Sequence, residues 1–314
     1  MHIKEKALTL SDSISSVNSS SQKILLIGGC GYVGSYLYQQ LERAGFVVTV
    51  VDLLKRGNPL GLKVIEDDYA NLQRDFLRQF DAVLWFGGHS SVGQSLADPD
   101  GAAFNNCVNL FSFAKLLAGH TKLIYASSAS LYSTKSAPVV PASEGSLLNI
   151  PSQNAYDISK FAFDYLAKGF LSNYFALRMG TVSGYSPNLR PELVFNAMNI
   201  AAATTGRVHL KNSDSNRTIL FLSDLWLLVS KLLVTPQQPG VYNAGSMSFK
   251  MGELAHGIAS TWNAQVICEG DSDTYSFLLD TTCMKAICGS DLTVTNLSQR
   301  CHDFIEQYQV TKKT

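Results

Sequence analysis

Short apolar runs alternate along the chain with longer amphipathic segments. The first run, residues 24–27, is followed at once by glycines, a pattern typical of a buried parallel strand. Residues 32–44 then place apolar side chains at helical spacing, and Gly45 ends this segment. The further strands that we expect are residues 46–51, 63–65, 82–86, 122–126 and 174–179, and the further helices are residues 101–119 and 154–171. This alternation predicts an α/β fold, with a doubly wound parallel sheet covered by helices on both faces.

The alternation becomes irregular after Gly184. The elements predicted beyond it are helices at 192–204 and 223–234, a strand at 207–211, and a segment near 241–246 that returns to the sheet. We therefore expect a main domain at 23–184 and a smaller C-terminal lobe, mainly at 185–314. Seven of the eleven residues from 11 to 21 are serine, which predicts a flexible tail over residues 1–22.

Acidic and basic residues balance at 25 each among the 314 residues, which excludes a broad basic face for nucleic acid or anionic membranes. The sequence contains no apolar run long enough to span a membrane, and its first 22 residues lack the features of a signal peptide. The six cysteines are scattered, without a CxxC pair or the spacing of metal ligands. We therefore expect a cytoplasmic protein with free thiols and no metal site.

A glycine pattern follows the first predicted strand and opens the first predicted helix. Gly28, Gly31 and Gly34 have the spacing GxxGxxG. Glycines at such a turn let the backbone approach a pyrophosphate, which then lies on the amino terminus of the helix. Tyr32 and Val33 begin that helix. The sequence therefore predicts a Rossmann-type dinucleotide site that includes these five residues.

Acidic residues at the ends of the second and third strands suit the adenosine half of the same ligand. Asp52 lies 18 residues after Gly34, where a carboxylate accepts hydrogen bonds from the ribose hydroxyls. Such a carboxylate favours NAD because it repels the 2′-phosphate of NADP, whereas the following Lys55 and Arg56 favour NADP, so both cofactors stay open. Asp68 is our candidate for a contact with the adenine amino group.

A tyrosine and a lysine lie four residues apart on the helix predicted at 154–171. Tyr156 and Lys160 therefore share one face of that helix. An adjacent ammonium favours phenolate, so it lowers the tyrosine pKa from about 10 toward neutrality and permits acid–base catalysis. Ser128, at the end of the fifth strand, would bond both a substrate oxygen and the tyrosine hydroxyl. These residues predict hydride transfer by Ser128, Tyr156 and Lys160, with Tyr156 and Lys160 also contacting the cofactor.

These motifs, in this order, resemble the extended short-chain dehydrogenase/reductase superfamily. Within it they resemble the NAD-dependent epimerase/dehydratase family, in particular the UDP-galactose 4-epimerases, over about residues 23–308. The segment at 87–95 is similar to a family loop that lines the cofactor. This similarity implies a cofactor contact for Gly87 and substrate contacts for His89 and Ser90.

Further matches concern the serine strand and the second lobe. Ser128 matches the family's catalytic serine and Ser127 the residue before it, which implies a cofactor contact for Ser127. In the second lobe the resemblance implies that Arg217 contacts a nucleotide diphosphate. Thr181 stands where the epimerases have an asparagine near that diphosphate, and residues 268–271 lack the arginine of the family's RxGD segment.

Three functions follow from the resemblance. The first is an NAD-dependent nucleotide-sugar epimerase, an isomerase of carbohydrate metabolism that acts at C4 by reversible hydride transfer. The second is an NAD(P)H-dependent reductase or dehydrogenase of a nucleotide-linked keto-sugar, and the third is a non-catalytic dinucleotide-sensing protein. Ala129 and Ser130 stand where the family's 4,6-dehydratases carry an acid pair, so the sequence does not support that chemistry.

The resemblance also assigns roles to the two parts of the chain. The domain at 23–184 would bind NAD(P), and the lobe at 185–314 would mainly bind the nucleotide-sugar substrate. A homodimer is implied, formed through the helices predicted at 101–119 and 154–171. The phenylalanines of these helices either supply the interface or are buried against the sheet: Phe111, Phe113, Phe161 and Phe163.

Overall fold

The computed structural model describes residues 22–90, 92–133, 139–146, 148, 154–272, 274–292 and 295–312. The tail predicted for residues 1–22 lies outside the described residues, apart from Gln22. The chain divides into two compact units. The first comprises the described residues of segments 1–128, 150–178 and 226–242, and the second comprises those of 129–149, 179–225 and 243–314.

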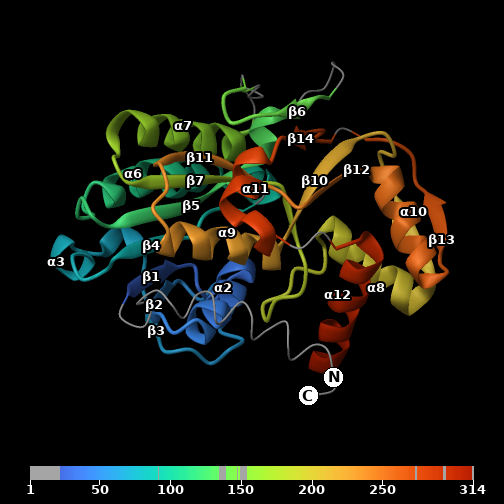
Figure 1. Ribbon diagram of the computed structural model, residues 1–314, viewed down its shortest axis with the longest axis horizontal. Coiled ribbons are helices and arrows are strands. Elements are labelled where there is room, and N and C mark those ends of the chain that lie inside the picture. Colours follow the sequence, from blue (N-terminus) through green and yellow to red (C-terminus); the bar gives the residue numbers. More distant parts are fainter. Residues whose placement is uncertain are drawn as a thin grey trace. The chain divides into compact units, whose positions relative to one another are not determined.

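A seven-stranded sheet forms the centre of the first unit (Figure 1). Its strands, in sheet order, are β3 (Val64–Glu66), β2 (Val47–Asp52), β1 (Lys23–Ile27), β4 (Ala82–Trp85), β5 (Lys122–Ser128), β7 (Tyr174–Met179) and β11 (Gly240–Ala244). β1 pairs in parallel with β2 and β4, β2 with β3, and β4 with β5. The strand order reverses direction at β1, and sheets of this kind bind ligands at the carboxyl ends of their strands. The predicted α/β class with a Rossmann-type sheet is confirmed.

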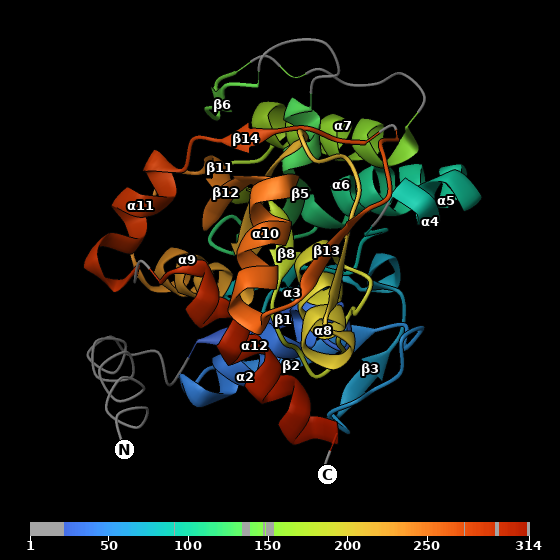
Figure 2. The same cartoon turned by 90° about the vertical axis from the view of Figure 1, so that its right-hand side faces the viewer.

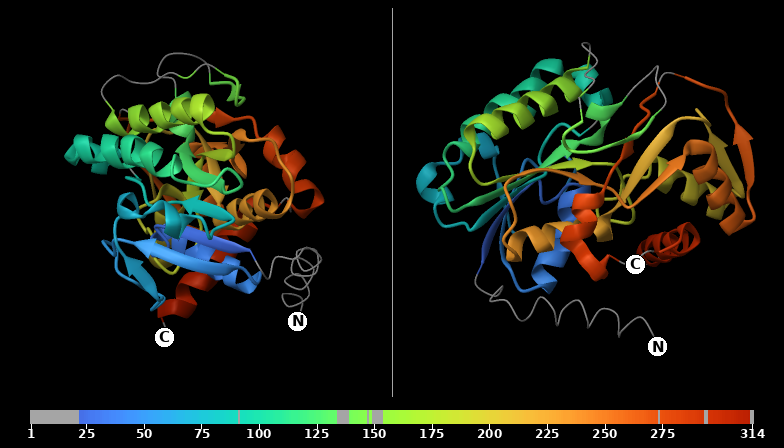
Figure 3. Two further views of the ribbon diagram at one scale, coloured as in Figure 1. Left: turned by 90° about the vertical axis from the view of Figure 1, so that its left-hand side faces the viewer. Right: turned by 45° about the horizontal axis from the view of Figure 1, so that its top comes forward.

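Helices cover both faces of this sheet, as Figure 1 and the right panel of Figure 3 show. One face carries α2 (Tyr32–Arg43) and α9 (Leu222–Val234), and the other carries α6 (Asn109–Ala114) and α7 (Ala155–Phe170). In α2, Leu37 and Leu41 lie one turn apart and are both fully buried. An apolar stripe of this spacing stabilises the helix by packing on the sheet rather than by intrinsic propensity.

The helix predicted at 101–119 is present as a continuous helical run from Pro99 to Ala114 with a π turn inside it. The run consists of α5 (Pro99–Ala103), the π-helical turn η3 (Phe104–Val108) and α6. Asparagine side chains compete for backbone groups and so favour such an interruption. Asn105 Nδ2 donates to the carbonyl of Gly87 at 3.2 Å, and Asn106 Nδ2 donates to the carbonyl of His89 at 3.2 Å. The π turn therefore ties this helix to the loop that follows β4. The remaining short elements of the unit are η2 (Tyr69–Asn71), α3 (Arg74–Leu77) and α4 (Val92–Ala97).

The core between the sheet and the helices α6 and α7 is aromatic. Tyr69 packs edge-on against Trp85 and Phe113, with ring centroids 5.8 and 5.4 Å apart. Phe163 packs edge-on against Tyr125 at 4.7 Å. Phe113 and Phe163 are only 2% and 1% exposed, so both are buried against the sheet and supply no surface to a dimer.

The second unit contains three small sheets and a group of helices. Its strands are β6 (Pro141–Ala142), β8 (Thr181–Ser183), β9 (Arg207–Leu210), β10 (Asn216–Phe221), β12 (Met247–Lys250), β13 (Gln265–Cys268) and β14 (Leu278–Leu279), paired in the orders β12-β10-β8, β13-β9 and β14-β6. Its helices are η4 (Ala129–Tyr132), α8 (Val194–Thr205), α10 (Met251–Trp262), α11 (Thr282–Cys288), η5 (Gly289–Asp291) and α12 (Leu297–Lys312). Figure 2 labels α8, α10 and α12, which contact one another. Phe195 lies in their shared core, with its ring 5.0 Å from that of Phe221 and 5.8 Å from that of Phe304.

Two findings limit the kinds of site that the described residues contain. None of their helices has both the length and the apolar character needed to cross a membrane. Nor do these residues include a group of three or more His, Cys, Asp or Glu side chains placed to hold a metal ion. All six cysteines are free thiols.

Candidate active site

The glycine loop between β1 and α2 packs tightly against the loop that follows β4. Gly28 has a φ of +78°, and a Cβ at this position would lie 2.7 Å from the Cα of Gly87. A Cβ on Gly34 would lie 2.0 Å from the carbonyl oxygen of Gly28, and one on Gly31 would lie 3.3 Å from the same oxygen. Any side chain at Gly28 or Gly34 would therefore force the turn apart. The structure thus brings together four of the residues predicted to contact a cofactor.

The amino terminus of α2 has the features of an anion site. Gly31 is its N-cap residue, no side chain caps the helix, and the first turn contains no acidic residue. Backbone N–H groups and the helix dipole both favour negative charge at such a terminus. Tyr32 is buried and Val33 half-buried in the first turn.

The carboxylate of Asp52 is fixed beside the glycine loop by two backbone groups. Its Oδ2 accepts a hydrogen bond from the N–H of Cys30 at 2.9 Å, and its Oδ1 accepts one from the N–H of Leu54 at 2.8 Å. A carboxylate oxygen that accepts one bond still has a lone pair for a second donor, such as a ribose hydroxyl. Burial, with a smaller contribution from Asp52, raises the pKa of Cys30 to about 11, so this thiol stays protonated at neutral pH.

The other residues considered for the adenosine half of the cofactor either bond to a neighbouring residue or are exposed to solvent. Asp68 is the N-cap of η2, and its Oδ1 accepts a bond from the N–H of Ala70 at 2.9 Å. Lys55 and Arg56 are exposed. The adenine contact of Asp68 stays a prediction.

The predicted catalytic tyrosine and lysine lie near the start of α7. The side chain of Asn154 caps this helix by accepting bonds from the N–H groups of Tyr156 and Asp157. Lys160 is 5% exposed, and its Nζ donates to the carbonyl oxygen of Ala126 at 2.8 Å. The same Nζ lies 5.9 Å from the centre of the Tyr156 ring. The ammonium is therefore close enough to the tyrosine to influence the charge of its hydroxyl.

Burial changes the proton affinity of this lysine. Loss of hydration lowers the pKa of Lys160 from 10.5 to about 7, and the carboxylate of Asp164 opposes this change. Lys160 Nζ also lies 4.7 Å from the centre of the Trp85 ring, a cation–π contact that favours the charged form. A group with a pKa near neutrality is suited to acid–base chemistry at ordinary pH.

The two serines that end β5 have different surroundings. Ser128 is the last residue of the strand and is 8% exposed. Ser127 Oγ donates to Asp164 Oδ2 at 2.9 Å, in a buried position on the side of the strand that faces α7. The hydroxyl of Ser127 is therefore used to hold Asp164, while its predicted contact with the cofactor stays a prediction.

Sequence reasoning missed Asp164 and Arg178, which form a buried ion pair. Arg178 Nε donates to Asp164 Oδ2 at 2.9 Å, and the two residues are 5% and 3% exposed. The available signal was the position of Asp164, four residues after Lys160 on the same face of the helix. An arginine near the end of an apolar strand was a second signal.

His89 is held by the N-cap residue of α5 and by the asparagines of η3. Its Nε2 lies 3.2 Å from Asp98 Oδ2 and its Nδ1 lies 3.3 Å from Asn105 Nδ2. Asn106 Nδ2 bonds both the carbonyl of His89 and the hydroxyl of Ser159, each at 3.2 Å. Sequence reasoning also missed these asparagines, although two adjacent asparagines inside a helix are an unfavourable choice that signals another use.

Ser90, the second predicted substrate contact of this loop, is exposed. Its N–H and its hydroxyl both donate to Gln94 Oε1, at 3.1 and 3.3 Å. These bonds are local, and the substrate contacts of His89 and Ser90 stay predictions.

In the second unit, the guanidinium of Arg217 is bonded only to neutral groups among the described residues. Its Nη2 donates to Thr274 Oγ1 at 2.8 Å and its Nη1 to the carbonyl of Asn216 at 3.1 Å, while the group lies 5.3 Å from the centre of the Phe277 ring. Burial lowers its pKa to about 10, so it stays charged at neutral pH. A partly buried guanidinium held by neutral partners is suited to bind an anion.

Two further polar residues of the second unit, Thr181, which the sequence predicted near the diphosphate, and Glu144, form hydrogen bonds within that unit. Thr181 is the first residue of β8, and its carbonyl accepts a bond from the hydroxyl of Ser183. Glu144 Oε1 accepts a bond from the N–H of Asn243 at 3.0 Å. Glu144 therefore ties the segment after β6 to β11.

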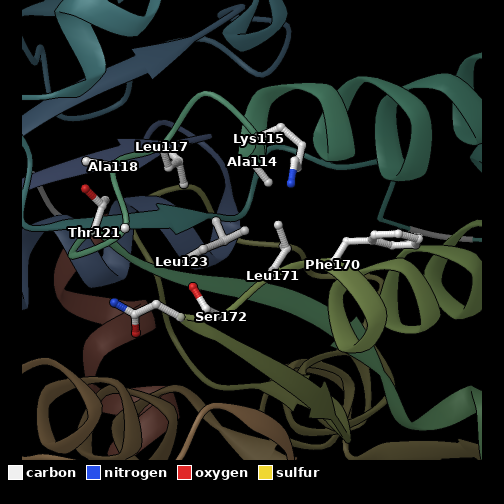
Figure 4. Close-up of a pocket in the computed structure, with 11 residues that line it drawn as sticks. Ala114, Lys115, Leu117, Ala118, Thr121, Leu123, Phe170, Leu171 and Ser172 are labelled. Carbon is white, nitrogen blue, oxygen red and sulfur yellow. The ribbon is translucent and has the colours of Figure 1, made fainter.

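A separate hollow of the first unit lies at the opposite end of β5 (Figure 4). It has a volume of about 130 Å³ and is lined by residues of the ends of α6 and α7, among them Lys115 and Phe170. Thr121, just before β5, and Leu123, near its beginning, also line it, whereas Ser128 ends this strand. The hollow is therefore distinct from the site formed by the glycine loop and the catalytic pair.

Comparison with protein families gives a match over most of the chain. Residues 24–245 match the model of the NAD dependent epimerase/dehydratase family. A UDP-glucose 4-epimerase of Corynebacterium glutamicum is 29% identical over 181 residues, which are 53% of this chain and 53% of that enzyme. The chain thus matches about half of the length of this curated relative.

Solved structures show the same fold. An NAD-dependent NDP-hexosamine 5,6-dehydratase of tunicamycin biosynthesis superposes with a TM-score of 0.79 at 21% identity, over 92% of this chain and 98% of the other. The UDP-glucose 4-epimerase of Thermotoga maritima, solved with UDP-glucose, superposes with a TM-score of 0.77 at 19% identity, over 93% of this chain and 100% of the other.

Proposed function

Because the chain belongs to the NAD-dependent epimerase/dehydratase family, we propose that it is a nucleotide-sugar epimerase that inverts C4 of the sugar. The observation that carries the proposal is the buried ammonium of Lys160 beside the Tyr156 ring, in the same unit as the glycine loop. The C4 position is supported by the curated relative, which is named a UDP-glucose 4-epimerase. Dehydratase chemistry is not proposed, because Ala129 and Ser130 follow β5 without an acidic pair.

The residues around the glycine loop fit a bound NAD. The uncapped amino terminus of α2 would receive the pyrophosphate, and Gly28 and Gly34 allow the tight turn that leads into this helix. The carboxylate of Asp52 would accept bonds from the adenosine ribose, which favours NAD over NADP. When bound, NAD would supply the reversible hydride acceptor that inversion at C4 of the sugar requires.

Tyr156, Lys160 and Ser128 would manage the accompanying proton. Tyr156 in its phenolate form takes the proton of the C4 hydroxyl as hydride leaves, and gives it back as hydride returns. Lys160 stabilises the phenolate by its charge, and Ser128 donates a hydrogen bond to the C4 oxygen. Each full cycle restores every group, so the enzyme needs no net oxidant or reductant.

The nucleotide part of the substrate would be held by the second unit. Arg217 has a charged guanidinium that is bonded only to neutral groups among the described residues, which suits a diphosphate. Thr181 would offer a neutral hydroxyl beside the same group. His89 and Ser90, on the loop after β4, would contact the sugar.

We also propose that the enzyme forms homodimers. An apolar patch of the first unit (Phe104 and Val108 of η3 with Ile158 of α7) is 57%, 49% and 41% exposed. The two elements contact each other, so a second copy of the same patch would cover both. Phe111 and Phe161 are half-buried and would contribute less. The six free thiols favour the cytoplasm as the compartment.

The decisive experiment measures bound cofactor and turnover on one preparation. We expect the purified protein to release NAD on denaturation, and to interconvert UDP-glucose and UDP-galactose without added cofactor. Net consumption of NAD(P)H with a keto-sugar substrate would instead establish a reductase. Retained NAD without turnover of any nucleotide sugar would favour a dinucleotide-sensing protein.

A further inference from the structure

The lysine of the candidate catalytic pair belongs to a buried group of three charged side chains. Lys160, Asp164 and Arg178 are 5%, 3% and 5% exposed. Lys160 and Asp164 lie one turn apart on α7, and Arg178 lies on the neighbouring strand β7. Buried charges are costly unless they are paired, so the partners of each of these three groups decide how much of that cost is offset.

The carboxylate of Asp164 is fixed by three donors. Tyr125 Oη donates to Oδ1, while Ser127 Oγ and Arg178 Nε donate to Oδ2, each at 2.9 Å. These bonds come from β5 and β7, so the charge of Asp164 has a defined place between the sheet and α7. None of the three donors is Lys160.

Lys160 is therefore buried without a direct bond to a carboxylate among the described residues. Its Nζ bonds the neutral carbonyl of Ala126 and lies over the ring of Trp85. The field of Asp164 favours the charged form of Lys160 and raises its pKa, against the larger effect of burial. Asp164 is thus the group that offsets part of the cost of burying this ammonium.

Arg178 limits the influence of the same carboxylate. Burial is the main cause of the raised pKa values of Tyr125 on β5 and Tyr174 on β7; at both phenols Asp164 raises the pKa further, whereas Arg178 lowers it. The ion pair therefore has a smaller net field than Asp164 alone. Tyr156 on α7 lies beside Lys160, while Tyr125 on β5 and Tyr174 and Arg178 on β7 interact with Asp164.

We propose that Asp164 and Arg178 are positioning residues that act through Lys160. The carboxylate of Asp164 keeps the ammonium of Lys160 charged, and the guanidinium of Arg178 limits how strongly that carboxylate acts. The inference rests on the proposed role of Tyr156 and Lys160. Loss of the Asp164 charge lowers the pKa of Lys160, so the ammonium loses its proton at a lower pH. The alkaline side of the activity profile then moves to lower pH.

The test compares pH profiles of kcat for three variants. In Asp164→Asn the alkaline half-activity point should fall by about one pH unit. In Arg178→Lys, which keeps the charge, it should stay in place. Tyr125→Phe is the matched control, because it removes one donor to the same carboxylate without changing any charge at neutral pH, and its profile should also stay in place.

A second variant covers the case in which Asp164→Asn fails to fold. Replacing a buried ion pair with apolar residues is often neutral for stability. The double variant Asp164→Leu/Arg178→Met removes both charges, and its half-activity point should fall by less than that of Asp164→Asn. Suppose that Asp164→Asn or the double variant folds and has a lower kcat, but its alkaline half-activity point does not move. The ion pair would then have a purely structural role, and the inference would be overturned.

A direct titration separates this inference from the proposed function. The holoenzyme is labelled with ¹³Cε-lysine, and the Lys160 signal is assigned by its loss in Lys160→Arg. The titration midpoint of this signal should fall in Asp164→Asn relative to wild type. If the midpoint shifts but no nucleotide sugar is turned over, the inference stands and the proposed function fails. If the enzyme epimerises and neither the midpoint nor the profile shifts, the inference fails and the function stands.

Discussion

The ammonium of Lys160 lies 4.7 Å from the centre of the Trp85 ring, although the two residues belong to different βα units. This contact places the lysine at the carboxyl end of β4, the strand whose following loop packs against the glycine loop. The catalytic lysine of α7 and the glycine loop that follows β1 therefore lie close together at the carboxyl ends of the central strands.

Replacement of Tyr156 should remove turnover and leave the cofactor in place. Tyr156→Phe deletes the hydroxyl that accepts the sugar proton, so we expect kcat to fall about 100-fold or more. NAD released on denaturation should match the wild type. Tyr165→Phe, on an exposed tyrosine of the same helix, is the control and should have wild-type kcat. Unchanged epimerisation by Tyr156→Phe would refute the tyrosine mechanism.

An alanine at Gly34 should prevent the glycine loop from closing. Its Cβ would lie 2.0 Å from the carbonyl oxygen of Gly28, so the loop and α2 must separate. We expect little or no NAD in the purified variant and a lower melting temperature. Gly169→Ala in α7 is the matched control, because its Cβ would meet no atom within 4 Å. Wild-type NAD content in Gly34→Ala would contradict this account of the site.

The free energy of unfolding should depend on pH because Lys160 is buried. The pKa of Lys160 is about 7 in the folded chain and 10.5 when it is solvated. Between these values the unfolded chain binds a proton that the folded chain has released, so the free energy of unfolding rises with pH across this window. The slope is about 1.4 kcal/mol per pH unit at most, and it is absent above and below the window.

Chemical denaturation at a series of pH values measures this contribution as the difference from Lys160→Met. The difference between wild type and this variant should change across the window in the stated direction. Lys168→Met, at an exposed lysine of α7, serves as the control and should follow the wild type. A difference independent of pH would show that Lys160 is not desolvated.

Arg217 should act on substrate affinity alone. Arg217→Met removes a charged donor worth about 1.5–3 kcal/mol, so we expect KM for the nucleotide sugar to rise about tenfold or more. The NAD content should not change, because the glycine loop belongs to the other unit. Arg207→Met, at an exposed arginine of the same unit, should keep the wild-type KM. An unchanged KM in Arg217→Met would exclude Arg217 from the substrate site.

The dimer should depend on the exposed apolar patch of η3 and α7. Phe104→Glu with Val108→Asp introduces charges that a second copy would have to bury, so sedimentation should show monomers. Val310→Asp alters an equally exposed apolar residue of α12 and should leave the sedimentation unchanged. A wild type that sediments as a monomer would refute the dimer itself.

The sequence by itself determined the strands and the long helices of the first unit and their order, but not its short helices η2, α3 and α4. Apolar runs and helical spacing predicted β1, α2, β4, β5 and α7, because these periodicities record which face of each element is buried. The glycine spacing at Gly28, Gly31 and Gly34 required a tight turn against another backbone, and the structure has that turn. Tyr156 and Lys160 were visible because residues four apart on a helix share a face.

Only the tertiary structure decided which distant groups these residues meet. Helical spacing placed Phe113 and Phe163 on helices, but packing against the sheet buried them, while Phe104 stayed exposed. The bond from Ser127 to Asp164 and the bond from Asp164 to Arg178 join elements that are far apart in the sequence. Local patterns fix backbone conformation and the buried face, whereas the partners of a buried charge depend on the order of strands in the sheet. For this reason Tyr156 and Lys160 could be predicted from the sequence, but the ion pair of Asp164 and Arg178 could not.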